Sequence, residues 1–321
     1  MQQIGVIRRF GLIMTVGAML IATYVVAVLA GPAIFDPSGL SLLYLTLFFV
    51  CLSAAWNVFS GLSGYINFGF AAFVGIGMYV SVIALVDLKF GLGPAYISGG
   101  IAAAMFAAVL GYPVLRIRGA YFSIAMLAIA EALRVLVSTD FLEPITRGGR
   151  GFPVLAGSLT QQYFAMLAIT FAVLACSFVL ANSRFGLELI AIREDETAAD
   201  GLGVNTARIK VTAFVISGFF AGVAGGIHAT FVHYIDPNSA FDIKFTIMPI
   251  IMTIFGGLGT VLGPLIGGVA LELISDYSWL YLGRMNVTIF GLILVALIIW
   301  QPEGLIVRLK ELGKLPKTRM L

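Results

Sequence analysis

Two charged residues lie three positions apart inside an apolar stretch of the chain. Glu131 and Arg134 fall in the run 119–138, and residues three apart share one face of a helix. A charge inside a bilayer is costly, so it usually faces protein or water and is paired. The spacing therefore predicts either an intrahelical ion pair at an interface or a charged gate or contact for a zwitterionic ligand. A proton relay would need a second membrane carboxylate, and none is evident.

A serine between two glycines offers a second kind of chemistry. The segment Gly61-Leu62-Ser63-Gly64 resembles the Gly-x-Ser-Gly motif of rhomboid intramembrane proteases, and His228 in a later apolar run would have to be the base that activates the serine. So short a motif is expected by chance in a glycine-rich chain, and His228 lacks the pattern that surrounds the base in that family. We expect His228 to be a packed or pore-edge histidine.

The chain contains no motif for nucleotide hydrolysis or metal binding. No Gly-x4-Gly-Lys-Ser/Thr phosphate loop and no His-Glu-x2-His sequence occurs. Cys51 and Cys176 each lie in an apolar run and are typical of small hydrophobic positions rather than of a disulfide or metal pair. We therefore expect no enzyme activity, no bound cofactor and no metal site.

The segments that position these residues are suited to hydrocarbon. Hydrophobic residues make up 60% of the 321 positions and charged residues 11%, against about 45–50% and about 25% in soluble domains. Since a span needs about 20 mostly apolar residues, we expect an all-α integral membrane protein of about ten helices (8–10) in a single domain, 1–321. The candidate spans are 11–30, 40–60, 64–86, 94–113, 119–138, 163–181, 209–232, 245–257, 261–276 and 285–300.

The basic residues predict an orientation. Thirteen of the 19 lysines and arginines fall in the segments that share a side with the N-terminus, and cytoplasmic loops carry the excess of positive charge. Both termini are therefore expected in the cytoplasm, together with the loop 182–210 and the short tail 301–321. The loop 139–162 then lies outside.

A short charged helix is predicted within the loop 182–210. Arg193, Glu196 and Asp200 recur at three- and four-residue spacing, so they would share one helix face. Ala198, Ala199 and Leu202 would form a small apolar patch beside it, and Gly203 fits a helix stop. The helix 193–203 is either a solvated loop helix at the membrane surface or a docking element for another protein.

This loop resembles the Glu-Ala-Ala-loop-Gly signature of ABC importer permeases, which carries their coupling helix. The matching residues are Glu196, Ala198, Ala199, Asp200, Gly201 and Gly203. Further blocks resemble the branched-chain amino-acid ABC permeases, and their LIV-M-type subunits in particular. They are an early glycine-rich block (Gly61, Gly64, Asn67, Gly69, Gly75, Gly77), a central block (Arg116, Arg118, Gly119, Glu131, Arg134), a late block (Gly256, Gly257, Gly259, Gly263, Pro264, Gly267) and a C-terminal block (Pro302, Glu303, Gly304, Leu305).

Glycines are expected to serve helix packing and turns. Pairs of small residues four apart, such as Gly218 with Gly222, allow close helix approach. The dense set from Gly256 to Pro264 predicts a tight turn between two half-length spans. The packing and turn positions are Gly69, Gly75, Gly77, Gly218, Gly222, Gly256, Gly257, Gly259, Gly263, Pro264 and Gly267.

The resemblance implies a permease subunit of an ATP-driven importer in a bacterial-type inner membrane. It implies a second homologous permease, cytoplasmic subunits that use the ATP, an external solute-binding protein and no nucleic acid. Branched-chain amino acids are the expected solute, with other amino acids, urea, amides and aromatic acids as alternatives. An ion-coupled secondary transporter of a small zwitterion or organic acid is the competing hypothesis. The residues predicted to line the path or gate are Asn57, Ser63, Asn67, Glu131 and Arg134.

Overall fold

The computed structural model describes residues 36–282 together with Pro32 and Gly291. The predicted first and tenth spans, 11–30 and 285–300, lie outside these residues. The long helices in the described part are α2 (Pro37–Trp56), α3 (Ala71–Val86), α4 (Leu92–Val114), α5 (Ala120–Ser138), α7 (Leu159–Ala181), α10 (Thr206–Val232), α12 (Lys244–Gly256) and α13 (Gly263–Leu282). They correspond one to one with the eight other predicted spans.

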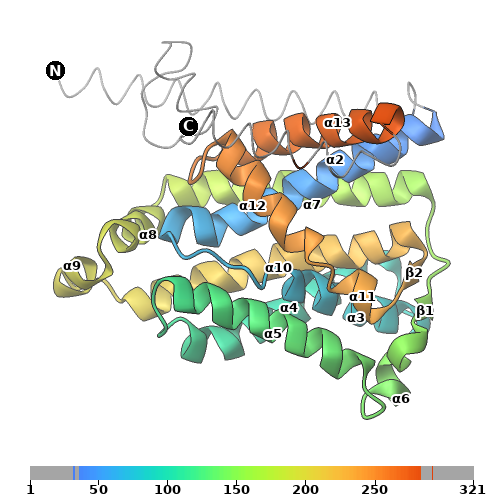
Figure 1. The fold of residues 1–321 in the computed structure, drawn as a ribbon, viewed down its shortest axis with the longest axis horizontal. Coiled ribbons are helices and arrows are strands. Elements are labelled where there is room, and N and C mark those ends of the chain that lie inside the picture. The colour runs from blue at the N-terminus through green and yellow to red at the C-terminus, as the bar shows by residue number, and fades with distance from the viewer. Residues whose placement is uncertain (1–31, 33–35, 283–290, 292–321) are drawn as a thin grey trace.

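Short elements join these helices at the two ends of the bundle. At one end, called here the hairpin end, lie α8 (Arg184–Glu194) and α9 (Glu196–Gly201). At the opposite end lie α6 (Glu143–Thr146), a 3-10 turn (Gly148–Arg150), α11 (Pro237–Ala240), β1 (Phe152–Pro153) and β2 (Tyr234–Ile235). The two strands pair antiparallel, with Phe152 opposite Ile235. Figure 1 shows α9 at the left and β1 and β2 at the right.

Six of the described helices are long and apolar enough to cross a bilayer. They are Pro37–Gly61, Leu92–Val114, Ala120–Ser138, Leu159–Ala181, Thr206–Val232 and Pro237–Gly256, with α3 as a shorter apolar helix. The expectation of an all-α, multi-pass membrane protein is therefore confirmed. The total of about ten spans and the cytoplasmic placement of both termini remain predictions.

The third predicted span begins seven residues later than expected. Residues 64–67 are non-helical, and α3 starts only at Ala71. Backbone outside a helix needs bonding partners wherever water is excluded. Asn67 provides several of them: its carbonyl accepts a bond from Trp56 Nε1 (3.0 Å), its N–H donates to Ser60 Oγ (3.2 Å), and its Oδ1 accepts the N–H of Gly69 (2.9 Å).

The glycine-rich segment between α12 and α13 forms a turn. α12 ends at Gly256 and α13 begins at Gly263, with Pro264 in its first turn. Gly257 and Gly259 adopt positive φ angles of 134° and 76°, which side chains with a Cβ rarely adopt. Gly267 lies against the backbone of α12, where an added Cβ would come 2.9 Å from the Gly256 nitrogen.

α10 runs through the middle of the bundle and packs mainly on α4, α3 and α2 (Figure 1). Its glycines allow this contact. A Cβ added at Gly222 would lie 2.6 Å from the Ala103 Cβ and 2.8 Å from the Gly99 carbonyl oxygen, and one added at Gly218 would lie 3.1 Å from the Ala107 Cβ. A Cβ added at Gly77 on α3 would lie 2.5 Å from the Cα of Gly222.

Gly69 and Gly75 allow two further close approaches. A Cβ at Gly69 would come 3.0 Å from the Cβ of Met126 on α5, and one at Gly75 would come 2.5 Å from the ring of Phe241. The first contact seats the 64–70 segment against α5, and the second seats α3 against the end of α11. Small residues thus set the spacing between elements that are distant in the sequence.

Substituting Gly222 should therefore separate α10 from α4. We expect Gly222→Ala to destabilise the protein by about 1–3 kcal/mol, the usual cost of overpacking a filled interior. Gly93→Ala is the matched control, because no atom lies within 4 Å of the Cβ it would add. Thermal unfolding of both detergent-purified variants measures the difference, and a Gly222→Ala protein as stable as the wild type would contradict this packing.

Candidate functional site

The charged loop at the hairpin end folds as two helices rather than one. α8 ends at Glu194, and Asp195 is extended (φ −157°, ψ 109°). The Asp195 Oδ1 accepts the N–H groups of Thr197 (2.8 Å) and Ala198 (3.0 Å), which starts a new helix at Glu196. Such a cap satisfies amides that the first turn of a helix leaves free. The prediction of one helix over 193–203, with Arg193 on the same face as Glu196 and Asp200, is therefore wrong.

Glu196 points inward, into a network of bonds. Its Oε1 lies 2.6 Å from Lys210 Nζ on α10, and its Oε2 accepts a hydrogen bond from the hydroxyl of Tyr65. The same ammonium donates to the Tyr65 hydroxyl (3.2 Å) and to the carbonyl of Leu115 at the end of α4 (2.9 Å). Arg118 Nε lies 3.9 Å from the carboxylate. One side chain of α9 is thus tied to α10, α4 and the 64–70 segment.

The network keeps Glu196 charged and Lys210 enclosed. Burial acts to raise the pKa of Glu196, but the bonds from Lys210 and Tyr65 outweigh it and hold that pKa below its ordinary value. The Lys210 side chain is only 3% exposed, and a lysine is almost never buried without a partner. The ion pair is therefore an interior feature of the hairpin end.

The outer face of α9 carries small residues, one exposed carboxylate and, just after the helix, one exposed leucine. Ala199 is buried, whereas Ala198, Asp200, Gly201 and Gly203 are exposed and Leu202 is 86% exposed. Gly203 has a φ of 88° and ends the helix. Of the predicted apolar patch, Ala198 and Leu202 face outward and Ala199 faces inward.

Arg193 ties α8 to the interior of the bundle. Its Nη1 donates to the carbonyl of Gly61 (2.9 Å), the last residue of a π-helical turn over Asn57–Gly61. Asn57 in the same turn donates from Nδ2 to the Thr260 carbonyl (2.8 Å) and accepts the N–H of Gly259 at Oδ1 (2.9 Å). Asn57 thereby fastens the turn between α12 and α13 to the end of α2.

The other two predicted polar path residues of this region are also buried. Ser63 and Asn67 are each about 1% exposed, and Ser63 Oγ donates to the Phe59 carbonyl (2.7 Å). His228 instead lies among aromatic rings, with Nδ1 3.4 Å from the Tyr44 hydroxyl. In the described part of the chain, Ser63 and His228 therefore have different hydrogen-bond partners and do not form the serine–histidine pair predicted for a protease.

A cavity of about 680 Å³ opens beside the network at the hairpin end. Its walls come from the 63–68 segment, the start of α5 and α8–α9, so Ser63, Arg193 and Glu196 line the same space. Arg118, Ile124 and Leu127 complete a lining that is apolar with cationic positions. The cavity lies where α5, the least buried of the six long apolar helices in the described residues, meets α8 and α9.

The ion pair on α5 lies on an exposed face. Arg134 Nε donates to Glu131 Oε2 (2.9 Å), and its Nη1 donates to Asn238 Oδ1 on α11. The Glu131 side chain is 59% exposed. Because an exposed ion pair at membrane depth needs protein or water against it, this face of α5 requires a polar neighbour.

Several residues that matter at these sites were not predicted from the sequence. Tyr65 and Lys210 complete the Glu196 network, and Asn238 extends the α5 ion pair. Glu272 on α13 is a buried carboxylate within a predicted span, which corrects the expectation that the spans hold no second carboxylate. The available sequence signals were a lysine, Lys210, near the start of an apolar helix and a glutamate, Glu272, inside an apolar run. No cluster of metal-binding side chains occurs among the described residues.

Known proteins resemble this chain over most of its length. It is 30% identical to the high-affinity branched-chain amino acid transport system permease protein LivM of Escherichia coli (strain K12), over 89% of this chain and 74% of the relative. It is 26% identical to the permease protein LivH of Salmonella typhimurium, over 81% of this chain and 91% of the relative. It is 30% identical to the guanosine ABC transporter permease protein NupQ of Bacillus subtilis, over 56% of this chain and 63% of the relative.

No solved structure matches the chain. A family model does match, and it is described as the branched-chain amino acid transport system / permease component. The match covers residues 38–300, which includes every long helix described above. The chain therefore belongs to the family of permease components of branched-chain amino acid transport systems.

Proposed function

We propose that this chain imports branched-chain amino acids, or similar small zwitterions, as one of two permease subunits in the inner membrane of a bacterial-type cell. ATP is used by cytoplasmic subunits, and an external binding protein delivers the solute. Family membership and the names of LivM and LivH, two permeases of the same kind of system, support this assembly. The match to a guanosine permease indicates that related chains serve other solutes.

The observation that carries the proposal is the construction of α9. Its outward face presents Ala198, Gly201 and Leu202, which a partner can approach closely, while its inward face holds the Glu196–Lys210 pair. A partner that pushes on α9 therefore moves α10, the end of α4 and the segment before α3 together. This arrangement suits a helix that receives movement from an ATPase and passes it to the spans.

The exposed face of α5 is the proposed wall of the solute path. It carries the Glu131–Arg134 pair together with Tyr121, Ile124 and Val135, which are 76%, 64% and 49% exposed. A second permease facing this wall would enclose a path with mixed polar and apolar sides. Asn57, Ser63 and Asn67 stay proposed path residues near its inner end, where their buried side chains also form hydrogen bonds at the helix ends.

Transport then follows from a shift between inward-open and outward-open populations, biased by ATP. The ion-coupled alternative leaves the exposed face of α9 without a partner, and the family match does not favour it. It predicts uptake by the isolated chain without ATP. The proposal predicts uptake only in the presence of the second permease and the ATPases.

The exposed Leu202 should be needed for ATPase docking. We expect Leu202→Glu to leave the spans folded but to weaken co-purification of the ATPase subunits at least tenfold, because a charge replaces the apolar centre of the contact. Leu155→Glu is the matched control, since Leu155 is 92% exposed at the opposite end. Equal ATPase recovery with both variants would contradict docking at α9.

The buried ammonium of Lys210 should be needed for coupling. We expect Lys210→Met to lower the amount of solute imported per ATP hydrolysed severalfold, because α9 loses its bond to α10 and α4. Arg208→Met alters an exposed cation two residues earlier on the same helix and should keep the wild-type ratio. The ratio is measured in proteoliposomes, and a wild-type value for Lys210→Met would refute the transmission role.

The exposed face of α5 should be accessible to water in the assembled transporter. In a protein whose Cys51 and Cys176 are replaced by alanine, Val135→Cys should react with a membrane-impermeant maleimide in the assembled transporter. Val109→Cys on α4 should not react if α4 faces lipid, although Val109 is 74% exposed in the subunit. Slower labelling of Val135→Cys in the presence of solute would support a solute path at this face. A Val135→Cys protein that stays unlabelled would contradict a path along α5.

A further inference from the structure

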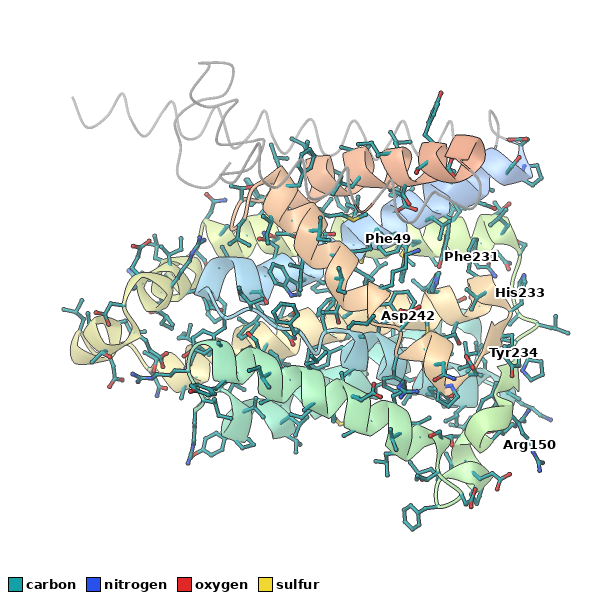
Figure 2. The ribbon with its side chains drawn as sticks, in the orientation of Figure 1. Phe49, Arg150, Phe231, His233, Tyr234 and Asp242 are labelled. Carbon is teal, nitrogen blue, oxygen red and sulfur yellow. The ribbon has the colours of Figure 1, made fainter. Side chains whose placement is uncertain are left out.

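A second, smaller pocket lies at the end of the bundle opposite the hairpin. Its volume is about 240 Å³, and it is enclosed by α2, the end of α10, β2 and the start of α12. Pockets that bind drug-sized ligands have volumes of about 300–1,000 Å³. This pocket is therefore of a size for a smaller molecule. Figure 2 labels Phe49 on α2 and Asp242 before α12, both from the elements that enclose it.

The floor of this pocket is apolar, aromatic and closely packed. Phe49, Met78, His228 and Phe245 line it, and all four are buried. The His228 ring stacks on Phe48 at a centroid distance of 4.0 Å and meets Phe245 edge-on at 5.6 Å. These contacts fix the floor before any ligand arrives, which lowers the entropic cost of binding.

The rim of the pocket carries one acid and one base. Asp242 and Lys244 both line the mouth and are both exposed. The Asp242 Oδ1 accepts the backbone N–H of Lys244 (2.8 Å), and Lys244 Nζ lies 5.5 Å from the centre of the Phe49 ring. Neither side chain forms an ion pair within 4 Å in the described part of the chain, although the charge of Lys244 acts on Glu272 and His228.

An acidic and a basic side chain at one rim favour a zwitterionic ligand over an anion or a cation. A simple apolar anion would meet the like charge of Asp242, and a simple apolar cation would meet that of Lys244. A zwitterion satisfies both, since opposite charges attract and like charges raise the cost of the wrong partner. An apolar side chain on that zwitterion would fill the aromatic floor.

We propose that this pocket is a solute subsite within the permease, where an apolar α-amino acid places its ammonium at Asp242, its carboxylate at Lys244 and its side chain against Phe49 and Phe245. The inference rests on the proposed function, because it supposes that the transporter carries such a solute. It adds a binding site inside this chain, separate from the exposed face of α5 and from the external binding protein.

Binding to the assembled transporter in nanodiscs tests the subsite without ATP or the external protein. We expect radiolabelled L-leucine to bind the wild type and to bind Asp242→Asn and Lys244→Met at least tenfold more weakly, which is about 1.4 kcal/mol. Lys244→Arg should stay within about threefold of the wild type. Lys89→Met and Asp140→Asn, at exposed positions outside the pocket, should bind like the wild type.

Competition by analogues separates a ligand contact from a structural role. 4-Methylpentanoate lacks the ammonium. It should displace radiolabelled leucine more effectively from the Asp242→Asn protein than from the wild type. 3-Methylbutylamine lacks the carboxylate. It should displace leucine more effectively from the Lys244→Met protein than from the wild type. A general loosening of the fold would produce neither crossover.

The outcomes for the two proposals can be told apart. Wild-type leucine affinity in both rim variants, equal losses in the two control variants, or no leucine binding by the wild type would overturn the subsite. ATP-driven leucine uptake by the wild-type assembly is measured separately in proteoliposomes. Its absence, with the rim variants still altering leucine binding, would overturn the proposed function and leave the pocket assignment standing.

Discussion

The structure depends on one constraint, which is that backbone polar groups need partners where water is excluded. Helices meet this need by themselves, so the places where helices stop are the places that require special residues. Asn67, with Trp56 and Ser60, supplies the partners where α3 begins late. Asn57 and Arg193 supply them at the π-helical turn and at the glycine-rich turn before α13. The side chains that supply these partners therefore lie toward the hairpin end.

The short helix α9 lies beyond the ends of the long helices but is bonded to them. α9 is short and would not be stable alone, so its position is set by Asp195 at its start and by Glu196 below it. The inward carboxylate joins the helix to the bundle, whereas Leu202 just after it is exposed. Glu196 thus faces the bundle, while Ala198, Gly201 and the following Leu202 face outward.

Most of the architecture could be predicted from hydropathy, because every described long helix coincides with a predicted span. The turn at 256–263 was also predictable, since clustered glycines and a proline rarely continue a helix. Residues 193–203 were misread because Arg193, Glu196 and Asp200 have helical spacing, while the Asp195 cap that interrupts them leaves no periodic signal. The partners of Glu196 come from Tyr65 and Lys210, 131 and 14 positions away, and pairing over such separations needs the fold.

α10 has a geometric consequence for the two ends of the molecule. Its 27 residues, at about 1.5 Å per residue, form a rod about 40 Å long. Its second turn holds Lys210, and its last turns carry His228 at the pocket floor. Close contacts of Gly218 and Gly222 with α4, and of Gly222 with Gly77 on α3, hold this helix near its middle. In the proposed transporter, thermodynamic reciprocity would require any effect of nucleotide on solute affinity at the pocket to be matched by an equal effect of bound solute on nucleotide affinity.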